Sequence, residues 1–331
     1  MTMRRHGLPF ALLSCIALSC ATAAFPAAAS AQDAKTDARP VWTTLGTSCG
    51  PIPNPGRAQP ANLLRAGDRL ILIDVGDGAT DQIGKAGIPF ETVDTLFISH
   101  HHFDHIGGLG ALIGRRYQVA AANVLTIYGP PGTKAIVEEL VGAVDAASLG
   151  GAVVREKVRR SPADMVKVVE IADGDTVSLG DMTVIAAANS HYVALASGAQ
   201  GPQPQSLSFR FNLPGRSIVY TGDTGPSENV EKLARGADLL ISEIIDPDAA
   251  LARIRASRPD LPENTLKLVG DHYRAEHLTP TAVGELAARA KVRALVITHN
   301  PIVDAALDTT RQAIAAVYKG PITIASDLDN F

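Results

Sequence analysis

Short apolar runs that end in polar or glycine-rich turns recur along most of this chain. In residues 69–76, leucine, isoleucine and valine lead into an acidic, glycine-containing turn, and residues 95–98 lead into a run of histidines. Such runs are typical of buried strands. The pattern predicts strands at 41–46, 63–64, 69–76, 95–98, 124–128, 166–171, 176–179, 182–187, 206–212, 217–220, 238–244 and 292–298.

Several of these runs are separated by segments in which apolar residues recur at helical spacing. This spacing predicts helices at 106–114, 132–144, 228–235, 247–258, 280–290 and 304–318, with Thr279 and Pro280 supplying a helix N-cap and first turn. We expect residues 259–276 to form an irregular polar insert. Strand pairs occur in both halves, and helices do not strictly alternate with strands. This favours two sheets packed face to face, with helices outside, over a doubly wound parallel sheet.

The first 31 residues have a different composition. Two arginines precede an apolar, small-residue-rich run at 8–24, and Ala29-Ser30-Ala31 fits a cleavage site. This predicts a signal peptide cleaved after Ala31, and hence a periplasmic or secreted protein. The run is short for a bilayer span, so we expect no stable membrane anchor. A lipid anchor through one of the two cysteines in this segment stays an alternative.

Beyond that segment we expect a flexible lead-in at 32–40 and one folded domain at 41–331. The chain has 331 residues, of which 46% are hydrophobic and 19% charged, with a net charge of −4. An acidic chain has no global attraction to a polyanion, so a nucleic-acid partner is predicted to be unlikely. Only Cys49 follows the predicted cleavage site, so no intrachain disulfide framework is expected. An oligomer is possible.

The strongest chemical signal is a cluster of four histidines and one aspartate within 100–105. In extended backbone, residues two apart point the same way, so His100 and His102 can reach one ion. Asp104 and His105 follow where the chain turns, so they can address a second point nearby. We expect His101 to face away from both.

Three further candidates, His191, Asp223 and His299, stand at the ends of predicted strands. Taken singly, each has an ordinary structural explanation: a hydrogen-bonded histidine, or an aspartate that forms a glycine-rich turn. A cluster of imidazoles is different, because it is costly to bury without a metal or hydrogen bonds. Imidazole nitrogen and carboxylate oxygen are normal zinc ligands, and a carboxylate can bridge two ions.

The run His100-His101-His102-Phe103-Asp104-His105 resembles the H-x-H-x-D-H signature of the metallo-β-lactamase fold superfamily, and the resemblance extends from about 41 to 325. It implies an α/β fold, a four-layer αβ/βα sandwich of two mixed β-sheets with helices on the outer faces. It also implies two Zn²⁺ ions, with Mn²⁺ or Fe as alternatives. The implied roles are His100, His102 and His191 on the first metal, Asp104, His105 and His299 on the second, Asp223 bridging them, and Asp74 orienting a ligand histidine.

Within this superfamily the chain is most similar to the branch of ribonuclease Z and zinc-dependent arylsulfatases, on residues 220–224 and 276–280 among others. By this resemblance His277 is a candidate proton donor and Glu243 its orienting partner. Asp104 is expected to position the nucleophile as well as hold a metal. His272 and Tyr273 are weaker candidates for the substrate pocket.

The resemblance leaves the substrate open. Ribonuclease Z carries a long basic, glycine-rich arm that holds tRNA, and no such arm is evident here. We therefore expect an exported dinuclear zinc hydrolase in which a metal-bound hydroxide attacks a small-molecule phosphodiester or aryl sulfate ester. The alternatives are a ribonuclease Z-like endoribonuclease that processes tRNA 3′ ends, a lactonase or other acyl hydrolase, and a periplasmic metal-binding protein without turnover.

Overall fold

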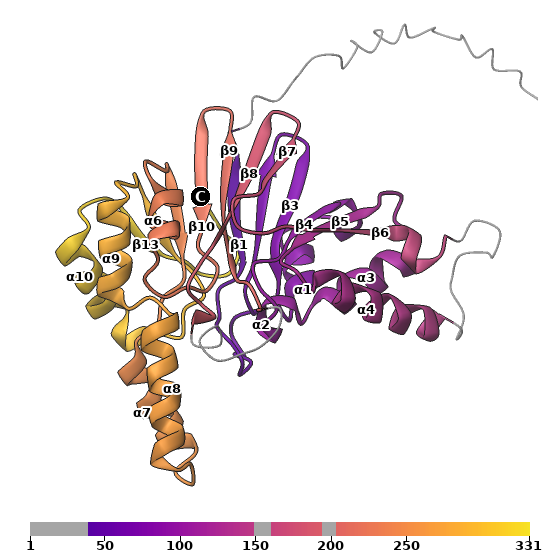
Figure 1. The fold of residues 1–331 in the computed structure, drawn as a ribbon. Coiled ribbons are helices and arrows are strands. Elements are labelled where there is room, and N and C mark those ends of the chain that lie inside the picture. The colour runs from indigo at the N-terminus through magenta and orange to yellow at the C-terminus, as the bar shows by residue number, and fades with distance from the viewer. Residues whose placement is uncertain (1–38, 149–159, 194–202) are drawn as a thin grey trace, which may run out of the picture. The chain divides into compact units, whose positions relative to one another are not determined.

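Two mixed β-sheets of seven strands each form the centre of the fold, and they confirm the predicted sandwich (Figure 1). The computed structural model describes residues 39–148, 160–193 and 203–331. The predicted signal peptide and residues 32–38 of the predicted lead-in lie outside the described residues. Within that described part, no helix is both long and apolar enough to cross a membrane.

Each sheet combines antiparallel strands on one side with parallel strands on the other. The first sheet has the spatial order β14 (Asp329–Asn330), β1 (Val41–Gly46), β2 (Ala61–Ala66), β3 (Arg69–Val75), β4 (Thr95–Phe97), β5 (Leu125–Gly129), β6 (Val166–Glu170). The second has the order β13 (Ile322–Ile324), β12 (Leu295–Ile297), β11 (Leu239–Ser242), β10 (Arg216–Tyr220), β9 (Leu207–Leu213), β8 (Met182–Ala188), β7 (Thr176–Leu179).

Helices cover the outer face of each sheet (Figure 1). The first sheet is covered by α1 (Ala79–Lys85), α3 (Leu109–Gln118) and α4 (Thr133–Ser148), and the second by α6 (Glu228–Ala234), α9 (Pro280–Arg289) and α10 (Leu307–Val317). The remaining helices are α2 (Phe103–Ile106), α7 (Pro247–Ser257), α8 (Glu263–Glu276) and the short 3-10 turns η1 (Phe90–Thr92), η3 (Pro162–Met165) and η4 (Asp304–Ala306).

The alternation of side chains along the central strands builds this layering. Ile71 and Ile73 face the core between the sheets, whereas Leu72 faces the helices outside the first sheet. In the second sheet Ile218 faces the core between the sheets and Val219 faces α6 and α9. A strand buried on both faces has no polar side, which is why these segments are continuous apolar runs in the sequence.

Three local predictions need correction. Residues 263–276 form the helix α8 rather than an irregular insert, because Leu266 and Gly270 recur at helical spacing on one buried face. The prolines at 259 and 262 lie before this helix and do not interrupt it. The helix expected at 106–114 is two helices, α2 and α3, separated by Gly107 and Gly108. Strands β13 and β14 were not predicted, since each is only two or three residues long.

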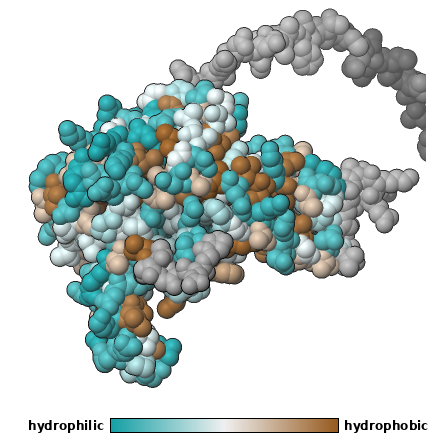
Figure 2. Space-filling view, in the orientation of Figure 1, coloured by the Kyte–Doolittle hydropathy of each residue, from teal (hydrophilic) through white to brown (hydrophobic). Residues whose placement is uncertain are grey.

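The α7–α8 hairpin is packed at a glycine. A Cβ on Gly270 of α8 would lie 2.8 Å from a methyl carbon of Leu251 in α7, so a larger residue there would require the Leu251 side chain to move. Arg274 of α8 also pairs with Asp248 of α7 at 2.6 Å. Figure 2 shows that most of the visible surface of the hairpin is hydrophilic. The hairpin connects β11 to α9 and brings the last turn of α8 back toward the sheets.

Candidate metal centre

The predicted ligands follow the carboxyl ends of strands from both sheets. His100 follows β4, His191 follows β8, Asp223 follows β10 and His299 follows β12. Strands β10, β11 and β12 are parallel, so their carboxyl ends meet at one edge of the second sheet. The fold thereby brings together the seven residues predicted from the sequence as metal ligands.

The first group contains His100, His102, His191 and Asp223, whose candidate ligand atoms all lie within 4.8 Å of one another. Nε2 of His191 lies 3.0 Å from Nδ1 of His102. Oδ2 of Asp223 lies 3.9 Å from Nε2 of His100 and 3.8 Å from Nε2 of His191. Three imidazoles and one carboxylate thus face a common point, which is a donor set that zinc accepts.

The second group contains Asp104, His105 and His299, again with ligand atoms within 4.8 Å. Nε2 of His299 lies 3.3 Å from Oδ2 of Asp104 and 3.3 Å from Oδ2 of Asp223. Nε2 of His105 lies 3.2 Å from Oδ1 of Asp223. Asp223 therefore reaches both groups, as a bridging carboxylate must.

Buried hydrogen bonds behind the cluster set the direction of the imidazoles. Nδ1 of His105 donates to Oδ2 of Asp74 at 2.8 Å, which turns Nε2 toward the cluster. Nδ1 of His191 donates to the backbone carbonyl of Glu276 at 3.0 Å, with the same effect. Nδ1 of His100 lies 3.0 Å from the Ser99 hydroxyl. In each ring the nitrogen that faces the cluster is the one that does not make this hydrogen bond.

Asp74 is the hub of this network. Its carboxylate accepts hydrogen bonds from the backbone N–H and the hydroxyl of Ser99, from His105 and from the hydroxyl of Tyr220 at 2.7 Å. Asp74 is fully buried and has φ 55°, a left-handed conformation that a non-glycine residue seldom adopts. The sequence did not identify the roles of Ser99 and Tyr220, although each stands next to a recognised motif.

The electrostatics of the cluster suit a bound cation. Burial, with the neighbouring His105, holds the pKa of His100 well below its usual value, and burial lowers the pKa of His191 to about 3. Burial opposes charge on His105 too, yet Asp223, Asp104 and Asp74 together raise its pKa well above normal. The first group therefore offers neutral imidazoles, while the buried carboxylates favour a nearby positive charge.

The donor atoms themselves fit a metal. Nε2 of His100, Nε2 of His105 and Oδ1 of Asp223 are buried, and none has a hydrogen-bond partner among the described residues. Buried polar atoms without partners are unfavourable, and these three converge on the two groups. An ion at each group would satisfy them, so the cluster is compatible with metal binding.

A buried histidine–glutamate pair lies beside the cluster. Nδ1 of His277 is 2.8 Å from Oε2 of Glu243, whose other oxygen accepts the backbone N–H of Thr224. The His277 ring centroid lies 4.8 Å from that of His191 and 6.2 Å from that of His299, so His277 adjoins both groups. Burial lowers its pKa, but the Glu243 carboxylate outweighs burial and raises the pKa to about 9. The Glu243 pairing therefore favours the protonated form of His277.

Aromatic side chains surround the cluster. Tyr192, which the sequence did not single out, packs its ring 5.1 Å from His191 and 5.2 Å from His102. The ring centroid of Tyr273 in α8 lies 6.0 Å from that of His277, and the ring centroid of His272 lies 5.4 Å from it. By contrast, His101 points away from the cluster and bonds to Thr133 at the start of α4.

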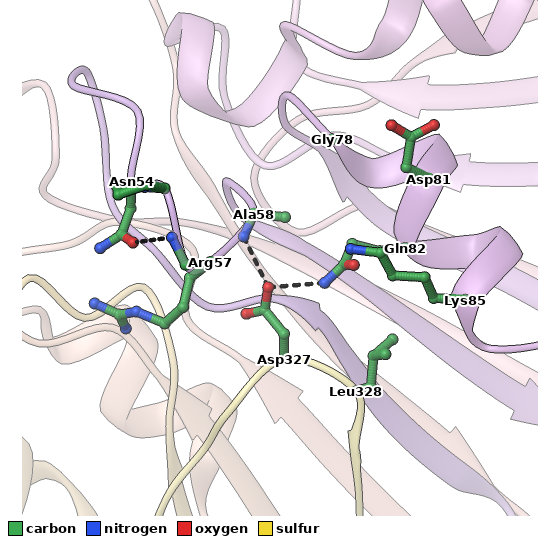
Figure 3. Close-up of a pocket in the computed structure, with 11 residues that line it drawn as sticks. Asn54, Arg57, Ala58, Gly78, Asp81, Gln82, Lys85, Asp327 and Leu328 are labelled. Carbon is green, nitrogen blue, oxygen red and sulfur yellow. Dashed lines mark hydrogen bonds between the residues drawn. The ribbon is translucent and has the colours of Figure 1, made fainter.

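The loop between β1 and β2 forms one wall of the site. The backbone N–H of Gly50 donates to Oδ2 of Asp104 at 2.8 Å, and a Cβ on Gly50 would come within 2.5 Å of that carboxylate. Asp327 braces the loop from the far side by accepting hydrogen bonds from Ala58 and Gln82, at a cavity of about 350 Å³ (Figure 3). This cavity lies among the bracing residues, not at the cluster.

Comparison with known proteins identifies the family of this chain. Residues 69–300 match the family model described as a β-lactamase superfamily domain. The chain belongs to the β-lactamase superfamily. It is 30% identical over 291 residues to ribonuclease Z of Mycobacterium avium, covering 86% of this chain and 95% of that protein, and 29% identical over 290 residues to ribonuclease Z of Mycobacterium tuberculosis, again covering 86% and 95%.

Solved structures show the same fold. The short form of human tRNase Z aligns with a TM-score of 0.60 and 22% identity, covering 88% of this chain and 98% of that one. A metallo-β-lactamase fold protein of Bacillus subtilis, YhfI, aligns with a TM-score of 0.63 and 20% identity, covering 88% and 98%. The chain is therefore a metallo-β-lactamase fold hydrolase with relatives named ribonuclease Z.

These relatives overturn one prediction from the sequence. A nucleic-acid partner was predicted to be unlikely from the acidic net charge, yet the similar proteins are ribonucleases. Net charge describes the whole surface, whereas a phosphodiester is bound locally. Here the local environment is a cluster of imidazoles suited to cations, which the total charge of the chain does not describe.

Proposed function

We propose that this protein is a dinuclear-zinc phosphodiesterase that hydrolyses RNA. The buried pair of His277 and Glu243 beside two metal-binding groups carries the proposal. Hydrolysis of a phosphodiester expels an alkoxide oxygen, which is a poor leaving group unless it is protonated. A proton donor held next to both groups serves that need, and the similarity to proteins named ribonuclease Z indicates the substrate class.

The chain's own residues divide the work. Glu243 fixes the His277 ring through Nδ1, so Nε2 is the atom that gives its proton to the leaving oxygen. The shared carboxylate of Asp223 and the Asp104 carboxylate fix the two groups relative to each other. Bound at these groups, zinc ions would activate water and neutralise the charge that develops on the phosphoryl oxygens. Asp74 keeps His105 oriented for this role.

RNA is proposed ahead of the other ester substrates because of the relatives. Aryl sulfates, lactones and other acyl esters can use the same donor set, since two metals serve all of these chemistries. The sequence similarity over 95% of a ribonuclease Z favours the phosphodiester. The predicted alternative of a ribonuclease Z-like enzyme is thus better supported than the predicted arylsulfatase.

A hydrolysis panel tests the proposal. Zinc-loaded protein would be assayed on a single-stranded RNA, a bis-aryl phosphate, a cyclic nucleotide, an aryl sulfate, a lactone and a β-lactam. We expect cleavage of RNA, with activity about 100- to 10,000-fold lower in His277→Ala. Asp223→Ala should abolish turnover and, unlike His277→Ala, should also reduce the metal content. Turnover of the lactone or sulfate without any RNA cleavage would refute the proposal.

Export is a separate proposal that rests on the first 31 residues. We propose that the segment is a signal peptide removed after Ala31, so that the enzyme meets its substrate outside the cytoplasm. Cell fractionation with N-terminal sequencing of the native protein tests this. A cytoplasmic protein that retains Met1 would contradict it and leave the hydrolytic proposal intact.

A further inference from the structure

A second histidine–glutamate pair lies at the end of α8, next to the first. Nδ1 of His272 is 2.6 Å from Oε2 of Glu276, one helical turn later. The His272 ring centroid lies 5.4 Å from that of His277 and 6.0 Å from that of His191. The last turn of α8 therefore presents an imidazole to the same space that His277 adjoins.

This pair differs from the salt bridges on the surface of the same helix. Lys267 and Asp271 of α8 also form a pair four residues apart, but their side chains are 72% and 55% exposed. The Glu276 side chain is only 4% exposed, and its backbone carbonyl orients His191. An exposed pair is worth little, whereas a buried carboxylate fixes its partner because it is costly to leave unpaired. Glu276 therefore holds the His272 ring in place.

The pairing decides which ring nitrogen of His272 is available to a substrate. A carboxylate can only accept, so Nδ1 donates to Glu276 and Nε2 is the ring nitrogen turned away from that carboxylate. The side chain stays 40% exposed, so a substrate can reach it. A ribose hydroxyl both donates and accepts, so it can form a hydrogen bond with Nε2 whether or not that nitrogen carries a proton.

The position next to His277 identifies that hydroxyl. When a phosphodiester is hydrolysed with the 3′ oxygen of a ribose as the leaving group, water oxygen bonds to phosphorus and the bond from phosphorus to O3′ breaks. His277 gives its proton to O3′, the water gives a proton to solvent, and the products end in a 3′-hydroxyl and a 5′-phosphate. The carbon next to the one bearing O3′ carries the 2′-hydroxyl, so a side chain beside His277 is in a position to contact it.

We propose that His272 forms a hydrogen bond with this 2′-hydroxyl through Nε2 and so distinguishes RNA from DNA at the cleavage site. The inference rests on the RNA hydrolysis proposed above. His272 acts as a positioning residue for the sugar and takes no part in proton transfer to the leaving oxygen.

A cycle of enzyme and substrate changes tests the contact. The substrates are one RNA oligonucleotide and the same oligonucleotide with a single 2′-deoxynucleotide on the 5′ side of the scissile phosphate. The enzymes are the wild type, His272→Ala, His272→Gln and the matched control Lys267→Ala, on the exposed pair of the same helix. Both kcat/KM and the equilibrium affinity for the 3′-hydroxyl product are measured on each substrate.

In the wild type and in Lys267→Ala, the deoxy substitution should lower kcat/KM and product affinity about tenfold, the value of one hydrogen bond. In His272→Ala this penalty should disappear, while His272→Gln, which keeps an acceptor, should retain part of it. A penalty that persists in His272→Ala, or that is absent from the wild type, would overturn the inference. If the wild type cleaves no RNA at all, the proposed function itself fails.

Discussion

Replacing Asp74 with Asn tests the hub of the hydrogen-bond network. The amide has the size of the carboxylate but offers one acceptor oxygen and one donor nitrogen. Asp74 accepts on both oxygens, from Ser99, His105 and Tyr220. With the amide oxygen in the position of Oδ2, three of these bonds survive, and the backbone N–H of Ser99 faces another donor.

The cost follows from these bonds. Each surviving bond changes from a charged acceptor to a neutral one and loses about 1 kcal/mol, and the unpaired N–H of Ser99 costs about 2 kcal/mol more. Removing a buried charge offsets part of this loss. We therefore expect the free energy of unfolding to fall by about 3 kcal/mol. Because His105 loses its charged partner, affinity for one zinc equivalent should fall 10- to 100-fold.

Two measurements check this expectation: urea unfolding of the metal-free protein, and zinc titration against a competing chelator. Asp238→Asn is the matched control, since Asp238 accepts from the N–H and hydroxyl of Ser217 but contacts no member of the cluster. It should lose about 1 kcal/mol, with unchanged zinc affinity. If Asp74→Asn binds both zinc equivalents as tightly as the wild type, then Asp74 does not orient His105 for metal binding.

Three further expectations can be checked with the same measurements. Gly50→Ala places a Cβ within 2.5 Å of the Asp104 carboxylate, so we expect about tenfold weaker binding of one zinc equivalent, and unchanged affinity would contradict the close approach. Tyr220→Phe removes a hydrogen bond to a buried carboxylate and should lower the free energy of unfolding by about 2 kcal/mol. The control Tyr318→Phe loses a bond to a neutral carbonyl and should cost about 1 kcal/mol. Equal losses would show that the charge of Asp74 does not strengthen its bond to Tyr220. Stripping both metals should lower the unfolding free energy by about 5.5 kcal/mol, or about 2.7 kcal/mol for each site, relative to protein at a free zinc concentration of 100 Kd. A melting temperature independent of chelator would argue against buried metal sites.

The sequence predicted the elements whose patterns are local. Continuous apolar runs identified the central strands, because strands such as β3 and β10 are buried on both faces. The dense histidine cluster after β4 identified the superfamily by resemblance. The structure brings His191, Asp223 and His299 to this cluster from strands far along the chain, a convergence that no local pattern encodes.

The features that the sequence missed depend on contacts between distant segments. In the sequence, Tyr220 is an ordinary strand residue. Its role arises because β10 packs opposite β3, so that its hydroxyl donates to Asp74, 146 residues away. Likewise, Glu276 looked like a member of a polar insert, because its role depends on a contact with His191 rather than on α8 itself. His272 was predicted as a pocket candidate, but its pairing with Glu276 was not.

The acidic net charge misled the prediction of the partner for a related reason. It averages over the whole surface, whereas recognition of a phosphodiester depends on a few side chains around the cluster. In the proposed cleavage of RNA, two side chains take separate roles: His277 adjoins both metal groups and would protonate the leaving oxygen, while His272 lies beside it on α8. Because each ring is fixed by its own buried glutamate, the two roles can be changed independently. Loss of His277 should therefore abolish RNA cleavage, whereas loss of His272 should only remove the penalty for a 2′-deoxynucleotide at the cleavage site.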